Sequence, residues 1–285
     1  MSDPFVTKNI LKWYDLNKRS LPWRKNVSKE KRQYNTLISE FMLQQTQVAT
    51  VIPYFNKFVK EIPNIKKLAS VDNKKLIKLW EGLGYYSRAR NLKKAAQSVI
   101  KNFNGVIPDN FDDLKSLSGI GDYTANAILA IAFNKPYIPL DGNVERIIKR
   151  YLYLKKEKEI QKENLIEKKS ILGFSNRSSD YAQALMEFGA LVCKPTNPMC
   201  CQCPITKKCK SFKKKDFNLT KNSKKYKDKY FLLKVYKKNQ KYLLIKNTEF
   251  NFLKNFDIFP MQEVIKPKNF NKDLNIKLSN MNMNI

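Results

Sequence analysis

The chain has 285 residues, 42% of them hydrophobic, and its 55 Lys and Arg against 25 Asp and Glu give a formal net charge of +30. Such a charge favours nucleic acid as partner, because each phosphate neutralised by Lys or Arg releases counterions. The alternative explanation of the high charge is a coding bias of the organism toward Lys and Asn. The absence of histidine excludes mechanisms with a His base and His-ligated zinc, and the lack of a long apolar run or signal-peptide pattern predicts a soluble, cytoplasmic protein.

The chain as far as about residue 210 is predicted to be helical. Apolar residues recur at helical spacing over 36–52, 122–133 and 143–154. Turn signals separate these segments at 62–64, 104–110 and 134–139. On a continuous first helix, Glu40 would share a face with Leu43, Gln44 and Gln47.

A Gly-Ile-Gly turn stands between two predicted helices in the segment LSGIGDYTANAILA, residues 117–130. Gly119 and Gly121 allow a tight turn, and the amides of the following helix can then face a phosphate. The alternative is a plain turn between helices. Asp122 opposes a phosphate by its charge, so we expect it to point away if the turn binds DNA.

Two carboxylates stand in sharply defined motifs, Glu40 in ISEFMLQQTQ (38–47) and Asp141 in PLDGNVERI (139–147). Paired carboxylates suit general acid catalysis and stabilisation of a cation. By themselves these residues could also be a solvated helix glutamate and an ordinary helix N-cap.

All five cysteines fall within residues 193–209. Four follow the spacing C-x6-C-x2-C-x5-C, and the fifth, Cys201, adjoins the second. Disulfides are not expected in a chain without a secretion signal. The compact thiolate loop favours a [4Fe–4S] cluster over zinc, which usually takes two separated short pairs, but both remain open.

The composition changes after about residue 212. Residues 213–228 are polar and basic, and the following apolar and polar residues alternate around KKNQK (237–241). This alternation predicts a β-hairpin.

Together, the motifs resemble those of the MutY-type adenine DNA glycosylases of the helix-hairpin-helix/endonuclease III superfamily. They are the two carboxylate motifs, the glycine turn, KRSLPWRKN (18–26), GLGYYSRARN (82–91) and the cysteine loop after YAQALMEFGALVC. The resemblance implies a mainly α, two-lobed helix-hairpin-helix glycosylase fold with an iron–sulfur cluster loop and a short, incomplete Nudix-like β region at the C-terminus.

The resemblance also implies a domain organisation. The catalytic domain would span 1–212, with a six-helix lobe at about 27–136 and an iron–sulfur lobe made of about 1–26 plus 137–212. A basic linker would follow at 213–228, and a partial Nudix-like region at 229–285. That last region carries no Nudix box, so no nucleotide pyrophosphatase activity is expected.

The activity implied by the resemblance is base-excision repair of double-stranded DNA by a monomer. The enzyme would flip out adenine mispaired with 8-oxoguanine or guanine, hydrolyse its N-glycosidic bond and leave an abasic site. Glu40 would protonate the adenine, and Asp141 would stabilise the cation at C1′ or bond to it, with Tyr123 and Asn143 orienting both acids. Tyr123 stands where endonuclease III has its strand-cleaving lysine, which implies a mainly monofunctional enzyme.

The remaining implied contacts surround this centre. Arg19, Leu21 and Trp23 would form the entry of the adenine pocket, and Gln183 would read the adenine edge. Gln45 and Tyr85 would wedge beside the opposing base, while Gly119 and Gly121 grip the DNA backbone. The cluster ligands would be Cys193, Cys200, Cys203 and Cys209, with Lys194, Lys207, Lys208 and Lys210 forming a basic loop around them.

Two other readings remain. The first is an endonuclease III-type glycosylase with lyase activity, which Tyr123 disfavours because a phenol cannot form a Schiff base. The second is a non-enzymatic basic DNA-binding protein with a structural metal centre.

Overall fold

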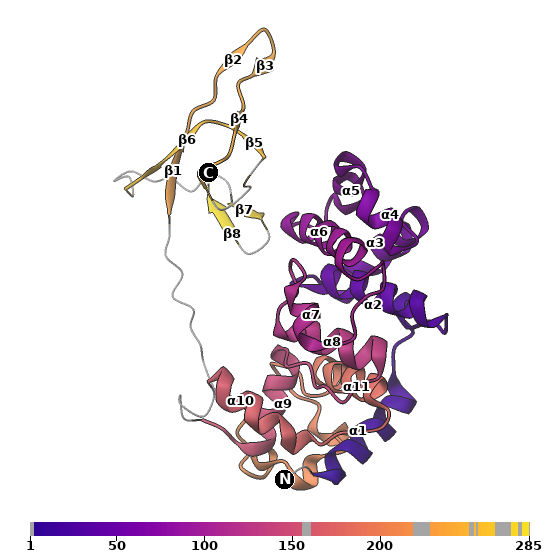
Figure 1. The fold of residues 1–285 in the computed structure, drawn as a ribbon. Helices are drawn as coiled ribbons and strands as arrows, with labels where there is room; N and C mark the ends of the chain where they lie inside the picture. Colours follow the sequence, from indigo (N-terminus) through magenta and orange to yellow (C-terminus); the bar gives the residue numbers. More distant parts are fainter. Residues whose placement is uncertain are drawn as a thin grey trace. The chain divides into compact units, whose positions relative to one another are not determined.

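The computed structural model describes residues 3–155, 161–218, 229–250, 254, 256–265, 275–278 and 281–284. The chain divides into a helical unit, 1–221, and a second unit, 222–285, that contains short strands. The prediction of a mainly α fold followed by short β-strands is confirmed (Figure 1). Within the described residues, no helix is long and apolar enough to cross a membrane.

The helical unit contains α-helices and the short 3-10 helices η1, η3, η4 and η5. The α-helices are α1 (Pro4–Asn17), α2 (Lys29–Leu43), α3 (Val48–Glu61), α4 (Ile65–Ser70), α5 (Asn73–Trp80), α6 (Ser87–Asn102), α7 (Phe111–Ser116), α8 (Asp122–Phe133), α9 (Gly142–Leu152), α10 (Lys162–Lys168), α11 (Ser178–Leu191) and α12 (Lys210–Lys213). The 3-10 helices are η1 (Pro22–Arg24), η3 (Lys169–Leu172), η4 (Cys200–Gln202) and η5 (Thr206–Lys208).

Polar N-caps fix where many of these helices begin. In each case a side-chain oxygen accepts a hydrogen bond from a backbone N–H in the first turn, which satisfies an otherwise unpaired donor. The capping residues are Asp3, Ser28, Asn64, Asp72, Asn110 and Asp141.

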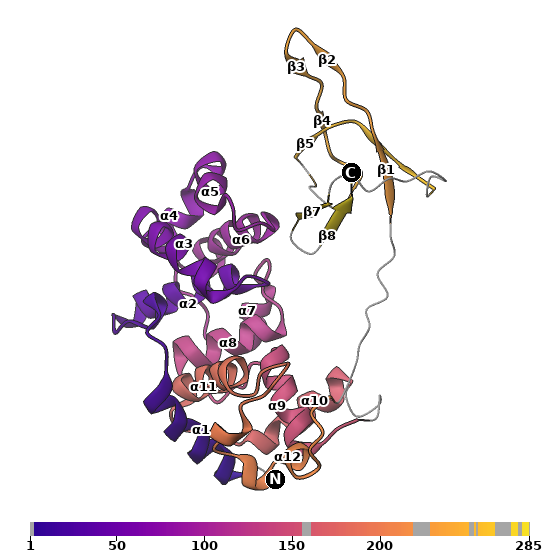
Figure 2. The same ribbon diagram turned by 180° about the vertical axis from the view of Figure 1, so that it is seen from behind.

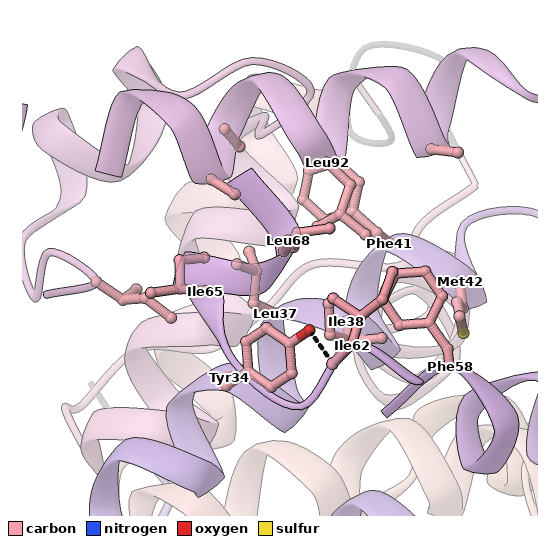
Figure 3. Close-up of a cluster of buried hydrophobic side chains, with 14 of the residues drawn as sticks. Tyr34, Leu37, Ile38, Phe41, Met42, Phe58, Ile62, Ile65, Leu68 and Leu92 are labelled. Atoms are coloured by element: carbon pink, nitrogen blue, oxygen red, sulfur yellow. Dashed lines mark hydrogen bonds between the residues drawn. The ribbon is translucent and has the colours of Figure 1, made fainter. Parts of the chain in front are cut away.

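A first hydrophobic core is formed by α2 to α8. Figure 3 shows part of it, where Leu37, Ile38 and Phe41 of α2 point toward side chains of the surrounding helices. Tyr34 is also buried there, and its hydroxyl donates a 2.6 Å hydrogen bond to the Ile62 carbonyl oxygen, which offsets the cost of burying a polar group. Burying these apolar side chains supplies the main force that holds the bundle together.

A second core joins the chain's beginning to its later helices. It is built from α1, α9, α10, η3, α11 and the cysteine loop, and Figures 1 and 2 show α1 running beside α11. Thr7 of α1 donates a 2.9 Å hydrogen bond to the Leu172 carbonyl oxygen across this core. Helix α8 packs against both α2 and α11 and so connects the two cores.

The predicted continuous helix around Glu40 is wrong in one respect. Helix α2 ends at Leu43, and Gln45 follows with φ 58°, in the left-handed region. Gln44 and Gln47 therefore lie in a turn and do not share a helical face with Glu40. Periodicity could not reveal this break, because the carbonyl groups at the end of α2 accept hydrogen bonds from Arg88, a residue of the distant helix α6.

The second unit contains paired short strands. These are β1 (Tyr230–Leu233), β2 (Lys237–Lys238), β3 (Lys241–Tyr242), β4 (Ile245–Lys246), β5 (Asp257–Ile258), β6 (Met261–Val264), β7 (Asn275–Leu278) and β8 (Met281–Asn284). The antiparallel pairs are β1 with β6, β2 with β3, β4 with β5, and β7 with β8.

The hairpin predicted around residues 237–241 is present as β2 and β3. Asn239 and Gln240 form its turn with φ 49° and 60°. Two successive residues with positive φ match a type I′ turn, whose twist suits antiparallel strands. The hairpin is shorter than the alternating pattern suggested, because β1 pairs with β6 instead of continuing it.

Candidate active site

One cavity of about 220 Å³ is lined by residues from both cores. Eight of the residues singled out from the sequence line it, although they are spread over 165 positions of the chain. They are Arg19, Leu21, Trp23, Glu40, Tyr123, Asp141, Asn143 and Gln183. The cavity thus brings together two carboxylates, a phenol, amides and a guanidinium.

Glu40 is almost completely buried on α2, with 5% of the residue exposed. The pKa of its carboxyl group is raised from 4.5 to about 7, mainly by burial and in part by the nearby charge of Asp141. A hydrogen bond from Tyr123 and the charge of Arg24 act in the opposite direction. Near neutral pH, Glu40 can therefore exist as a carboxylic acid that is able to donate a proton.

Asp141 is held at the N-terminus of α9 and also lines the cavity. One carboxylate oxygen accepts hydrogen bonds from the backbone N–H groups of Asn143 (3.0 Å) and Val144 (2.7 Å). The other accepts a 2.7 Å hydrogen bond from the Asn143 side chain. Burial raises the pKa of Asp141, while these donors lower it. The hydrogen bonds also fix the direction of the carboxylate.

Tyr123 lies in the first turn of α8 and lines the same cavity as the two acids. Burial raises the pKa of its phenol well above 10, and the charges of Glu40 and Asp141 add to the effect. Its hydroxyl lies 3.3 Å from the sulfur of Met186. Tyr123 is therefore a neutral hydrogen-bonding group at any physiological pH.

The amino end of α9 is pressed against α11. A Cβ at Gly189 of α11 would lie 2.5 Å from the Cβ of Asn143 and 3.1 Å from its backbone, so glycine is needed for this approach. Arg146 donates 2.8 Å and 2.7 Å hydrogen bonds to the Asn143 side chain and the Gly189 carbonyl, and a 2.7 Å bond to the Cys193 carbonyl. These contacts fix the position of Asp141.

Arg24 and Glu187 also line the cavity, and the motif analysis did not identify them. The side chain of Glu187 is fully buried and pairs with both Arg19 and Arg24. It accepts from the Arg19 backbone N–H (2.7 Å) and Nε (2.9 Å), and from Nη1 of Arg24. The signal available in the sequence was a single carboxylate within the apolar run ALMEFGALV.

Gln45 and Tyr85, the predicted wedge residues, lie outside the cavity on two turns. Both have positive φ, 58° for Gln45 and 46° for Tyr85. Gln45 is exposed and Tyr85 is partly exposed. These side chains can therefore contact a binding partner that lies outside the cavity.

The predicted glycine turn leads into α8, with Gly121 as its N-cap residue. Gly119 has φ 82°, and a Cβ there would lie 2.8 Å from the Cβ of Asn91 and 2.9 Å from the ring of Phe41. Both the backbone angle and the packing therefore require glycine. Asp122 forms a 2.7 Å ion pair with Lys115, which compensates part of its charge at this turn.

The cysteines of the predicted ligand set line a second, apolar cavity. The lining includes Cys193, Cys200, Cys203 and Cys209 but not Cys201, which is exposed. The buried side chain of Arg150 donates hydrogen bonds to the carbonyls of Lys194 (2.6 Å) and Pro195 (2.7 Å) and fixes the loop. Among the described residues, no group of three or more Cys, Asp or Glu side chains is arranged to hold a metal ion.

Of the four lysines predicted around this loop, Lys208 is engaged within the protein. It forms a 3.0 Å ion pair with Asp3 at the start of α1. Lys194, Lys207 and Lys210 have no ion pair among those found between the described residues.

Comparison with known proteins gives one consistent result. Residues 38–171 match the HhH-GPD superfamily of base excision DNA repair proteins. The chain is 41% identical, over 245 residues, to the adenine DNA glycosylase of Buchnera aphidicola subsp. Baizongia pistaciae, covering 83% of this chain and 68% of that protein. It is 40% identical over 214 residues to the human adenine DNA glycosylase, covering 71% of this chain and 38% of that one.

Solved structures show the same fold. The chain is similar to a thermostable thymine-DNA glycosylase with a TM-score of 0.65 and 27% identity, over 73% of this chain and 95% of that one. It is similar in fold to endonuclease III in a non-covalent complex with DNA, with a TM-score of 0.60 and 23% identity, over 74% of this chain and 95% of that one.

Proposed function

Since the chain belongs to the adenine DNA glycosylases of the HhH-GPD superfamily, we propose that it binds double-stranded DNA and removes adenine paired with 8-oxoguanine or guanine, leaving an abasic site. The observation that carries this proposal is the buried Glu40 with a pKa raised to about 7, in one cavity with Asp141 and Tyr123. We further propose that the chain acts as a monomer.

Glu40 supplies the proton that adenine needs in order to leave. A neutral adenine leaves far more readily than its anion, so protonation at a ring nitrogen such as N7 assists cleavage of the bond to C1′. The electron pair of that bond goes to the base. Glu40 is left as a carboxylate, which can then accept a proton from the attacking water and return to its starting form.

Asp141 stabilises the sugar as it becomes positively charged. An ionised carboxylate next to an oxocarbenium-like centre lowers the barrier, as in glycoside hydrolysis. The hydrogen bonds from Asn143 and Val144 hold Asp141 in place and favour its charged form. Tyr123 orients the acids and remains a neutral phenol, so water completes the reaction and the DNA strand is not cut by the enzyme.

The rest of the cavity suits a flipped adenine. Leu21 and Trp23 supply apolar surface, and Gln183 supplies an amide for the base edge. Glu187 is a carboxylate that can accept a hydrogen bond from the exocyclic amino group of adenine. Arg24, paired with Glu187, can donate to a ring nitrogen.

Extrahelical adenine leaves a gap in the duplex that must be supported. An enzyme that acts on a base inside a duplex must first unstack it. Gln45 and Tyr85, on their turns outside the cavity, are suited to wedge beside the opposing base. Gly119 and Gly121 shape the start of α8, where backbone amides can face a phosphate.

The four-cysteine cavity is suited to a [4Fe–4S] cluster. The donor set is four thiols around one apolar space, which suits a compact cluster held by four thiolates. A cluster held by four thiolates supplies structural support, because no iron position is open to substrate. We expect anaerobically purified protein to contain about four iron atoms per chain. Stoichiometric zinc without iron would contradict this assignment.

The function is tested by excision from a duplex with one adenine opposite 8-oxoguanine. The product strand is analysed with and without alkali, and wild type is compared with Glu40→Gln. The matched control is Glu145→Gln, which changes a partly exposed glutamate that pairs with Lys149 on α9. We expect alkali-dependent cleavage for wild type and Glu145→Gln only. Excision by Glu40→Gln within threefold of wild type would refute the assigned acid.

A further inference from the structure

We propose that Arg88 is a positioning residue that ties the Gln45 turn to the Tyr85 turn, so that opening of the duplex depends on a side chain inside the protein. This inference rests on the wedge function proposed for Gln45 and Tyr85. Nothing in the sequence motifs separates Arg88 from Arg90, two positions further along α6. Their surroundings in the fold differ: Arg88 is 6% exposed, whereas Arg90 is partly exposed.

One side of the Arg88 guanidinium holds the end of α2. Its Nη1 donates hydrogen bonds to the carbonyl oxygens of Met42 (2.8 Å) and Phe41 (3.2 Å), and to that of Gln44. The last carbonyls of a helix have no partner within the helix and form the negative end of its dipole, which favours a cation there. Arg88 thereby fixes the residue that immediately precedes Gln45.

The other side of the same guanidinium holds the second turn. Nη2 donates hydrogen bonds to the carbonyl oxygens of Leu83 (3.0 Å) and Gly84 (3.1 Å), directly before Tyr85. The guanidinium carbon lies 5.5 Å from the centre of the Tyr85 ring and 5.6 Å from that of Trp80. One planar group therefore joins two turns whose central residues are 40 positions apart.

Both turns need such support. Gln45 and Tyr85 adopt positive φ without being glycine, a conformation that persists only where the surroundings enforce it. Hydrogen bonds to Gln44 on one turn and Gly84 on the other act next to these residues. Among the ion pairs found in the described part of the chain, none involves Arg88, so its charge is matched by carbonyl dipoles.

Lysine cannot replace this geometry. It keeps the positive charge but lacks the planar fork that reaches two sets of acceptors at once. Arg88→Lys should therefore release one turn while preserving the overall charge of the surface. A misplacement of about 1 Å in a group that acts on substrate can lower a rate about 100-fold.

A double-mutant cycle separates positioning from simple structural damage. Single-turnover excision from the A:8-oxoguanine duplex is measured for wild type, Arg88→Lys, the double variant Gln45→Ala/Tyr85→Ala, and the variant carrying all three changes. Arg90→Lys is the matched control, with the same substitution on the same helix. The pH dependence of the rate is recorded for each protein to follow Glu40.

The expected result is a loss of about 10- to 100-fold for Arg88→Lys in the wild-type background and less than threefold when Gln45 and Tyr85 are already alanine. The pH midpoint assigned to Glu40 should not move, and Arg90→Lys should match wild type. An equal loss in both backgrounds, including a loss from misfolding, would overturn the proposal, as would an unchanged rate for Arg88→Lys. A wild-type chain that removes no adenine would instead refute the proposed function.

Discussion

Glu40→Gln should change both the rate of adenine excision and the pH dependence of stability. The folded protein raises the pKa of Glu40 from 4.5 to about 7, mainly by burial. Between these two values the folded state retains a proton that the unfolded state loses, so this group's contribution to stability declines as pH rises through that range. The shift corresponds to about 3 kcal/mol, because one pKa unit is worth about 1.4 kcal/mol.

Glutamine has no such proton to lose. The free energy of unfolding of Glu40→Gln relative to wild type should therefore rise by about 3 kcal/mol between pH 4.5 and pH 8. Urea titrations of both proteins at several pH values measure this difference, in which the titration of all other groups largely cancels. Wild-type excision should fall about tenfold per pH unit above 7 as the acid form disappears, and Glu40→Gln should be about 10²–10⁴-fold slower at its optimum.

Two results would refute this reasoning. A stability difference between the proteins that stays constant from pH 4.5 to pH 8 would show that the Glu40 pKa is not raised. A pH-independent wild-type rate above pH 7, under conditions where the chemical step is measured, would show that Glu40 does not supply the proton. Glu145→Gln is the control in both experiments, since Glu145 lies at the surface with Lys149 as its partner.

Three further predictions concern the surroundings of the acids. Gly189→Ala should lower stability by about 1–3 kcal/mol and the excision rate about 100-fold, because the added Cβ would collide with Asn143. The control is Gly142→Ala, where an added Cβ would have nothing within 4 Å, and it should leave both the stability and the excision rate close to those of wild type. Glu187→Ala should destabilise the fold by about 3–5 kcal/mol in thermal or urea unfolding, because a buried pairing partner is removed; a change under 1 kcal/mol would contradict this. Borohydride should trap no covalent adduct between wild type and DNA, because Tyr123 cannot form a Schiff base; an adduct yield matching base loss would disprove it.

The sequence alone determined the fold class and the type of enzyme. Helical periodicity over the first 210 residues, alternation around residues 237–241 and the spacing of the motifs are local features, and they survive in the structure because capping, turn and periodicity rules act over a few residues. The adenine glycosylase prediction is confirmed by the relatives. The roles of individual site residues, the cysteine ligands and the domain limits stay predictions.

Only the tertiary structure decided which side chains meet. The end of α2 could not be found from periodicity, because its last carbonyls are bonded by Arg88 from another helix. Burial of Glu40, and hence its raised pKa, depends on the packing of helices that are far apart in sequence. The pairing of Glu187 with Arg19 and Arg24 spans more than 160 residues. Such long-range contacts leave no periodic trace in the sequence, since each partner is compatible with many other neighbours until the fold brings them together.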